Sequence, residues 1–265
     1  MLKYTLERFL SMLLVIFIII TATFLLMHSI PGGPFTGEKN LPPAVIQNIM
    51  ERYKLNDPLW KQYTDYLVNV VQFDFGPSFK YEDRTVNQII ADGLPISATL
   101  GFGSAGLALI LGIPAGIIAA LRQNKWPDYA VMFAATIGIS VPNFITATLL
   151  IYVLALKLEL LPAAMWGGIE YAIMPCMALA ALPTAVIARL TRSSMLDVMG
   201  QDYIRTAKAK GLSTFTVIWR HALKNALMPV VTYLGPMIAF ILLGSFVIEN
   251  IFAIPGLGRY FVMSI

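Results

Sequence analysis

Charged residues are scarce in this chain of 265 residues. Lys, Arg, Asp and Glu together make up 13% of the sequence, whereas hydrophobic residues make up 57%. Soluble proteins carry roughly 25% charged residues, so a chain with so few cannot cover a globular surface of this size with polar side chains. An intrinsically disordered chain is excluded because its apolar content would be far lower. The composition therefore indicates an integral membrane protein that is largely covered by lipid.

Cysteine and histidine are scarce as well. The single cysteine, Cys176, excludes an intrachain disulfide and a zinc site built from cysteines. The two histidines, His28 and His221, lie far apart in the sequence, which argues against a histidine metal site. The phosphate-binding pattern G-x-x-x-x-G-K-[ST] is absent, so the chain does not bind ATP through a P-loop. We predict no catalytic residue, no metal, no cofactor bound by this chain and no nucleic-acid partner.

Five apolar segments are long enough to cross a bilayer as helices, which needs about 20 residues. They are 9–30, 98–121, 129–156, 171–188 and 226–248. The third is long enough to cross with a tilt or to include a kink. The first is longer than a signal-peptide core and is followed by a poor cleavage site, so we expect it to be retained. The sequence thus predicts an all-α integral membrane protein with one transmembrane domain, 1–265.

Basic residues in the loops predict the orientation, because cytoplasmic loops of membrane proteins are enriched in Lys and Arg. Segment 189–225 holds seven basic residues and two acidic ones, and loop 122–128 carries Arg122 and Lys125. Both are predicted to be cytoplasmic, together with the N-terminus and its Lys3 and Arg8. Segment 31–97 is then extracytoplasmic.

The external segment 31–97 shows apolar residues at helical spacing in two places. The first group is Ile46, Ile49, Met50 and Tyr53, and the second is Trp60, Tyr63, Leu67 and Val70. They predict two short amphipathic helices, which are followed by a turn-rich stretch at 74–78. The segment is either a folded cap on the outer mouth of the protein or a docking or gating surface, and both interpretations stay open.

The cytoplasmic segment 189–225 predicts a short helix followed by a second one. Asp202 begins the first helix, Lys208 and Lys210 stand in its last turn, and Gly211 follows its end, as helix start and stop signals require. Ser213 is placed to cap the second helix. The predicted apolar face of that helix is Phe215, Ile218, Trp219, Ala222 and Leu223. The pair is either a docking element for a soluble partner or a basic loop that is simply helical.

Glycines within the second span match the dinucleotide pattern G-x-G-x-x-G at 101–106. That pattern needs a preceding strand and a later acid, whereas here it lies in an uncharged span. Small residues let transmembrane helices approach closely, so we interpret these glycines, with Gly112 and Gly116, as packing sites. Asp74-Phe75-Gly76 copies a kinase triplet but lacks every accompanying kinase element.

Polar residues near the prolines of the spans are candidates for lining a pore. Kinks at proline free backbone carbonyls, which are tolerated where helices pack together or line a wet cavity. The pore-lining candidates are Ser140, Asn143, Thr146, Thr184 and Thr232. The same side chains could instead form hydrogen bonds between helices, and the sequence does not distinguish this role from pore lining. Glu249, at the outer end of the fifth span, is predicted to be interfacial.

The stretch 202–212 resembles the cytoplasmic coupling loop of ABC importer permeases, whose pattern is E-A-A-x-x-x-G followed by a proline at the next span. Ala207 and Gly211 match this pattern. Arg205 and Thr206 replace the usual Glu and Ala, variants associated with the oligopeptide and dipeptide branch. Segments 74–78, 221–229 and 249–258 resemble that branch as well. The likeness runs along the entire chain and is closest to the B-type permeases of oligopeptide importers.

The resemblance implies a type I importer permease, the pore-forming subunit of an ATP-driven oligopeptide importer in the bacterial cytoplasmic (inner) membrane. Its partners would be a second homologous permease, two cytoplasmic ATPase subunits that bind ATP and Mg, and an extracytoplasmic peptide-binding protein. This chain itself would not be an enzyme. The residues implied to couple to the ATPase are Asp202, Tyr203, Arg205, Thr206, Ala207, Lys210 and Gly211. Members of the family continue into a sixth span, so we expect the native chain to continue beyond residue 265.

Two kinds of alternative stay open. Related permeases carry dipeptides, murein peptides, nickel or haem. An ion-coupled secondary transporter belongs to another class, but it would normally show intramembrane acids and inverted repeats.

Overall fold

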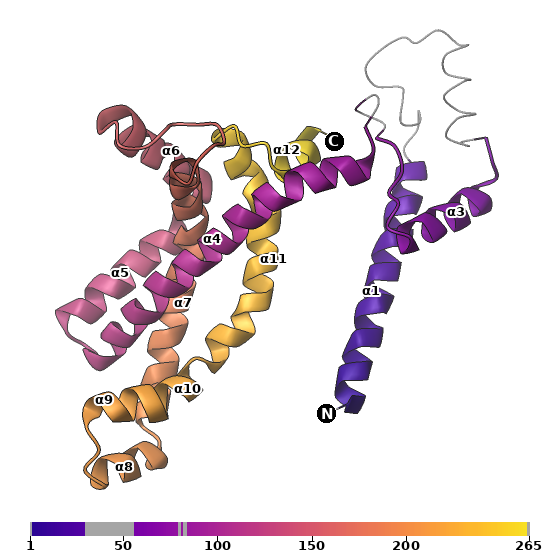
Figure 1. Ribbon diagram of the computed structural model, residues 1–265. Coiled ribbons are helices and arrows are strands. Elements are labelled where there is room, and N and C mark those ends of the chain that lie inside the picture. Colours follow the sequence, from indigo (N-terminus) through magenta and orange to yellow (C-terminus); the bar gives the residue numbers. More distant parts are fainter. Residues whose placement is uncertain (1, 30–55, 79–80, 82–83, 264–265) are drawn as a thin grey trace. The chain divides into compact units, whose positions relative to one another are not determined.

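The protein is helical in the part of the chain that the computed structural model describes, residues 2–29, 56–78, 81 and 84–263 (Figure 1). Within these residues the only bridge between extended segments is an isolated antiparallel one that joins Pro77 and Thr85. Four helices are long and apolar enough to cross a bilayer, and a fifth candidate consists of two segments bent by 104°. The predicted fold class, an all-α protein with several apolar spans, is confirmed.

The first of two compact units, Met1–Gln88, pairs a long apolar helix, α1 (Leu2–Ser29), with a shorter one, α3 (Leu59–Val71). Aromatic side chains join them. The buried ring of Phe24 lies 5.1 Å from the ring of Tyr63, whose hydroxyl is 2.6 Å from the hydroxyl of Thr21. The rest of α1 is almost entirely exposed within this unit, as suits a helix surrounded by lipid or by a partner span.

Helix α3 corresponds to the second of the two amphipathic helices predicted outside the membrane. Tyr63, Leu67 and Val70 are half-buried, as the helical spacing predicts. Trp60 was predicted on the same face but is 69% exposed, because it stands in the first turn, before the contact with Phe24 begins. The other predicted helix, around residues 46–53, lies outside the described residues.

The turn after α3 is held by one amide side chain. Asn87 Nδ2 donates to the carbonyl of Phe73, and its Oδ1 accepts from the backbone N–H of Phe75 at 2.8 Å. Asp74 Oδ1 accepts from the N–H of Gly76, which has a φ of +77°. A side chain rarely tolerates that conformation, so the triplet Asp74-Phe75-Gly76 has a structural explanation as a turn.

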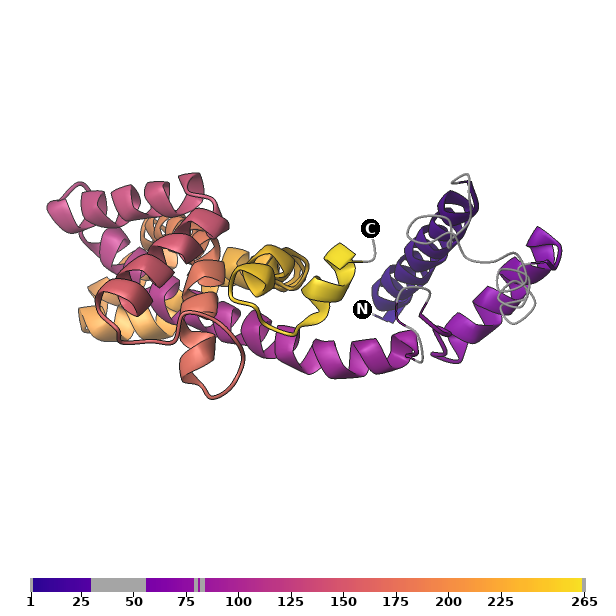
Figure 2. The ribbon, with the colours of Figure 1, turned by 90° about the horizontal axis from the view of Figure 1, so that it is seen from above.

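The second unit, Ile89–Ile265, contains the remaining helices. In chain order they are α4 (Val86–Leu121), α5 (Trp126–Ser140), α6 (Asn143–Leu150), the π-helical η1 (Ile151–Lys157), α7 (Glu170–Met199), α8 (Asp202–Ala209), α9 (Thr214–Thr216), the π-helical η2 (Val217–Ala222), α10 (Leu223–Ala226), α11 (Met228–Ile251) and α12 (Leu257–Met263). Helix α7 contacts α5, α6, α10 and α11 and so lies at the centre of the unit (Figures 1 and 2).

The core of this unit is formed where α4, α7 and α11 meet. Its fully buried members include Leu100 of α4, Met174 and Leu179 of α7, and Met237 and Ile248 of α11. These helices are apolar on most of their circumference, as expected when one side faces the bundle and the other faces lipid.

Glycines of α4 let that helix approach α7 closely. A Cβ atom added to Gly112 would lie 2.9 Å from the carbonyl oxygen of Thr184, and one added to Gly116 would lie 2.5 Å from that of Ala188. Real Cβ atoms do not come so near to backbone oxygen, so only glycine fits. In the G-x-G-x-x-G stretch, a Cβ on Gly101 would lie 2.8 Å from the end of the Leu242 side chain, whereas nothing lies within 4 Å of a Cβ on Gly106. The interpretation as packing sites is confirmed for Gly101, Gly112 and Gly116 but not for Gly106.

We expect the substitution Gly116→Ala to destabilise the protein. The added methyl group has to push α4 away from the backbone of α7, and overpacking of this kind costs about 1–3 kcal/mol. Gly106→Ala is the matched control, because nothing lies within 4 Å of its added Cβ. The measurement is thermal unfolding of the purified protein in detergent. Equal unfolding temperatures for the two variants would contradict the close contact.

The observed helices are longer than the predicted apolar spans, and one span is broken. α4 begins at Val86 rather than at residue 98, and α7 continues to Met199 rather than ending at 188. The predicted third span, 129–156, bends at Val141 and Pro142. Proline lacks the N–H that a helix needs and pushes the preceding residue into extended conformation, and Val141 has φ −88° and ψ 120°.

Candidate coupling surface and pore

Helix α8 (Asp202–Ala209) begins and ends where the sequence predicts. Asp202 lies in its first turn, and Gly211 follows it with a φ of +77°. The N–H of Gly211 donates to the carbonyl of Lys208 at 3.0 Å, and that of Leu212 donates to Ala207 at 3.4 Å. These two bonds form a Schellman motif, which satisfies the last carbonyls of the helix and needs a left-handed residue at the position of Gly211.

One face of α8 is buried against its own chain, in what we name the α8 cluster. Its buried members are Ala120, Met195, Ile204, Ala207, Val217, Ile218, Ala222 and Ala226, which come from α4, α7, α8, η2 and α10. Ile204 is 0% exposed and Ala207 is 5% exposed. The resemblance implied that Ala207 contacts the ATPase, but this side chain faces inward. Spaced three residues apart, Ile204 and Ala207 share one helical face. That face packs against η2, in a cluster that also includes Met195 at the end of α7.

The opposite face of α8 is exposed and polar, with the basic Arg205 and Lys208 beside the acidic Asp202. The other residues implied to couple to the ATPase all lie there or at the helix end: Asp202, Tyr203, Arg205, Thr206, Lys210 and Gly211. Arg205 Nη1 is 3.4 Å from Asp202 Oδ1, and both side chains are largely exposed. Exposed pairs of this kind contribute little to stability. The charges of this face are therefore available to a partner.

A hydrogen bond connects α8 to the short helix that leads into α11. Asn225 Nδ2 donates to the hydroxyl of Tyr203 at 2.8 Å. Tyr203 is 41% exposed. Its ring is therefore both part of the outer face and a contact to α10, a link that sequence reasoning did not find.

The second helix of this segment starts as predicted and buries only part of the predicted face: Ile218 and Ala222 are buried and Leu223 is half-buried. The hydroxyl of Ser213 accepts from the N–H of Thr216, which confirms the predicted cap. Val217 is buried, whereas Phe215 and Trp219 are exposed, with their ring centroids 5.9 Å apart. The predicted face assumed 3.6 residues per turn. The π-helical η2 closes its hydrogen bonds over five residues instead of four, which shifts the inward positions.

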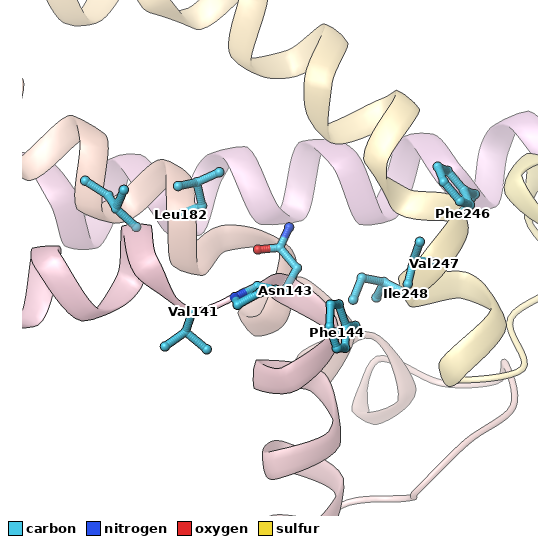
Figure 3. Close-up of a pocket in the computed structure, with 9 residues that line it drawn as sticks. Val141, Asn143, Phe144, Leu182, Phe246, Val247 and Ile248 are labelled. Carbon is cyan, nitrogen blue, oxygen red and sulfur yellow. The ribbon is translucent and has the colours of Figure 1, made fainter.

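One of the five pore-lining candidates, Asn143, borders a pocket at the broken span. Asn143 lines a pocket of about 310 Å³ at the break between α5 and α6. Figure 3 shows its amide together with Val141 and Phe144 of the break, Leu182 of α7, and Phe246, Val247 and Ile248 of α11. These seven residues and two further apolar ones surround the same space. The pocket is therefore apolar with a single amide.

The other four pore-lining candidates are not gathered at this pocket. Ser140 and Thr232 are exposed, and Thr232 Oγ1 donates to the carbonyl of Met228 at 3.0 Å. Thr146 is half-buried on α6. Thr184 Oγ1 is buried without a hydrogen-bond partner, and the backbone of Thr184 packs against Gly112.

An ion pair between a buried aspartate and a half-buried arginine joins α5 to α7, and sequence reasoning missed it. Asp128, which is 2% exposed, accepts from both Nε and Nη2 of Arg192, the second at 2.7 Å. It also accepts the N–H of Asn124 at 2.9 Å. The prediction counted Asp128 and Arg192 only as loop charges. The signal in the sequence was an acid at the end of an otherwise basic loop.

Glu249, predicted to be interfacial, is buried within its own chain; its depth in the membrane stays a prediction. It is 0% exposed and accepts hydrogen bonds from the hydroxyl of Ser97 and from the N–H of Gly258, both at 2.7 Å. The same Ser97 hydroxyl accepts the N–H of Leu257 at 2.9 Å. The chain after Phe252 folds back over the end of α11 and covers the carboxylate, a return that an apolar pattern cannot indicate.

Comparison with known families identifies the type of protein. The model of the family described as binding-protein-dependent transport system inner membrane component matches residues 112–265, and the model of its N-terminal part matches residues 1–101. The chain belongs to this family.

Curated relatives match the chain along nearly its whole length. The dipeptide transport system permease protein DppB of Bacillus subtilis is 54% identical over 265 residues, which are 100% of this chain and 86% of the relative. The oligopeptide transport system permease protein OppB of Escherichia coli K12 is 49% identical and covers 99% of this chain and 86% of the relative.

A solved structure shows the same fold. The inward-facing methionine ABC transporter MetNI matches with a TM-score of 0.54 at 16% identity, over 66% of this chain and 80% of that one. The predicted type I importer permease is thereby confirmed. The chain is a multi-pass permease subunit of an ABC importer and not itself an enzyme. Importers of this family work with a binding protein and with ATPase subunits.

Proposed function

We propose that this permease is the pore-forming subunit of an ATP-driven importer of peptides in the bacterial cytoplasmic membrane. The observation that carries the proposal is the geometry of α8. It is a short helix with one face buried in the α8 cluster, which includes the end of α7, and an exposed face that presents Arg205 and Lys208 to a partner. Relatives named as oligopeptide and dipeptide permeases, at 49% and 54% identity, support a peptide as the substrate. Oligopeptides are the substrate that we favour, and dipeptides are the alternative.

In this proposal the exposed face of α8 sits in a groove of one of two cytoplasmic ATPases. Closure of the ATPases around ATP and Mg moves α8, and the α8 cluster passes this movement to α7 and α10 because close-packed interiors deform little. A second, homologous permease completes the pore, and an extracytoplasmic binding protein delivers the peptide. Selectivity then resides mostly in the binding protein.

A mostly uncharged pathway suits peptides with varied side chains. We place Asn143 and its pocket on this pathway, because an amide can hydrogen-bond a peptide backbone whatever the side chains are. Ser140, Thr146, Thr184 and Thr232 remain candidates for other parts of the path, on the α-helices that carry them.

The proposed topology has the N-terminus and α8 in the cytoplasm and segment 31–97 outside. In a Cys176→Ala background, a cysteine at Asp65 should react with an impermeant thiol reagent in intact cells. A cysteine at Lys208 should react only after the cells are opened. Lys208 is exposed and Asp65 is half-buried, so neither position is fully shielded from the reagent. Labelling of the Lys208 position in intact cells would reverse the model.

Copurification and uptake test the function directly. Affinity purification of this chain from its own host should recover two ATPase subunits and a second permease, whereas an ion-coupled carrier would purify without them. Cells that express the complex should take up a labelled tripeptide. Competition by unlabelled dipeptide, pentapeptide, nickel and haem then identifies the substrate class, and uptake that nickel or haem alone suppresses would overturn the peptide proposal.

A further inference from the structure

We propose that Asp128 and Arg192 are a positioning pair that makes α5 and α7 move as one body, so that a displacement of α8 reaches the break at Val141 and Pro142. The inference rests on the proposed role of α8 as the coupling element. It assigns a role to a partly buried ion pair that the proposed transport mechanism does not otherwise explain.

The geometry of the ion pair restricts the orientation of the Arg192 side chain relative to Asp128 as well as the distance between them. Two nitrogens of Arg192 donate to the two carboxylate oxygens of Asp128, and a bidentate contact of this kind restricts rotation. Oδ2 also accepts the N–H of Asn124, which has a φ of +57° in the turn between α4 and α5. The carboxylate therefore anchors that turn and the start of α5 to one side chain of α7.

Two further contacts extend this attachment along α5. Arg189, one turn before Arg192 on α7, donates from Nη2 to the hydroxyl of Thr136 at 3.3 Å. Near the break, a Cβ on Gly138 would lie 3.0 Å from the Cβ of Ala185 and 3.2 Å from the carbonyl oxygen of Ala181. Helix α5 is thus attached to α7 at its start, in its middle and beside its end.

The two ends of the α5–α7 body lie at the α8 cluster and at the break between α5 and α6. Near the C-terminus of α7, Met195 belongs to the α8 cluster, as does Ile204 of α8. At the other end, α5 stops at Ser140, directly before the break and the pocket that Asn143 lines. A rigid α5–α7 body therefore connects the surface that the ATPase would move to the place where the pathway bends. Rigid-body shifts of packed helices are a common form of such transitions.

The test uses the complete importer in proteoliposomes. The binding protein and a labelled tripeptide are on one side of the membrane, and ATP is on the other. The variants are Asp128→Asn, Arg192→Gln and the double variant, and Lys125→Gln is the control, since its exposed charge stands in the same turn. We expect copurification of the ATPases and ATP hydrolysis to persist in all four. Peptide imported per ATP hydrolysed should fall roughly tenfold in both single variants, a typical size for an allosteric coupling, and stay normal in Lys125→Gln.

The double variant distinguishes a pair from two independent effects. If the two residues act through each other, peptide import per ATP in the double variant should be no lower than in either single variant. Where the single variants do not accumulate, Arg192→Lys decides, because lysine keeps the charge but not the two-pronged contact. Its complex should assemble and import less peptide per ATP. Unchanged import per ATP in the assembled variants would overturn the inference, whereas a wild-type complex that imports no tripeptide would instead overturn the proposed function.

Discussion

Aspartate in place of Ala207 should detach α8 from the membrane domain and abolish peptide uptake. The methyl group of Ala207 is 5% exposed and belongs to the α8 cluster, whose other buried members are aliphatic. A carboxylate there would be buried among Met195, Ile204 and Val217 without a partner, which costs several kcal/mol. The cluster is the main attachment of α8, so the helix should separate from the rest of the cluster. Limited proteolysis of inside-out vesicles should then cut the chain between residues 200 and 213 much faster than in the unaltered protein.

Ala209→Asp is the matched control, with the same substitution two residues further along the same helix. Ala209 is exposed, so its new carboxylate stays in water and protease resistance should be unchanged. The charge nevertheless stands on the exposed outer face that we assign to the ATPase. A loss of about 1.4 kcal/mol there is tenfold in affinity, and ATPase pull-down should fall accordingly. Normal pull-down and uptake in Ala209→Asp would remove the outer face of α8 from the coupling surface.

The contrast between Ala207 and Ala209 shows which features of α8 could be predicted from the sequence. The bounds of α8 follow from local chemistry, because Asp202 and Gly211 act on the backbone of their own helix. Which face of the helix turns inward depends on its neighbours. The pattern of Ile204 and Ala207 indicates a shared face, but only the positions of Met195 and Val217 show that this face is covered by the same chain.

The transmembrane spans could be predicted from local composition, whereas the contacts between them could not. Apolar length alone identifies α4, α7 and α11, and the closely spaced glycines of α4 indicate a tight contact. Neither signal says which helix Gly116 meets. The shifted face at Phe215 and Trp219 was out of reach because a π-helix is decided by packing rather than by the residue pattern.

Buried charges were the least predictable feature of the site. Asp128 and Glu249 each stand at the edge of an apolar segment, where charged side chains are normally exposed to water or headgroups. Their burial depends on partners distant in sequence, Arg192 for one and Ser97 for the other. Hydropathy treats every residue separately, so it assigns Asp128 to a loop and Glu249 to the interface.

Glu249→Ala should be the most destabilising change in the outer half of the protein. Its carboxylate accepts the hydroxyl of Ser97 from α4 and the N–H of Gly258 from the start of α12, so three segments meet on it. Removal of the carboxylate leaves the Ser97 hydroxyl and the Gly258 N–H without an acceptor in a buried site. Each unsatisfied donor costs about 1–3 kcal/mol. Gly256 and Gly258 both pack against the carboxylate so closely that an added Cβ would collide with it. Alanine therefore also leaves a cavity beneath this turn.

The measurement is thermal unfolding of the purified complex in detergent, together with the amount of protein in the membrane. Glu249→Gln should lose less than Glu249→Ala, because the amide keeps one acceptor oxygen for Ser97 or Gly258 and fills the space. Glu159→Ala is the control, since Glu159 is exposed in a loop, and surface changes usually stay within about 0.5 kcal/mol. Abundance and unfolding temperature that match in Glu249→Ala and Glu159→Ala would show that the buried carboxylate does not hold the turn between α11 and α12. The expected order of stability, from highest to lowest, is Glu159→Ala, Glu249→Gln and Glu249→Ala.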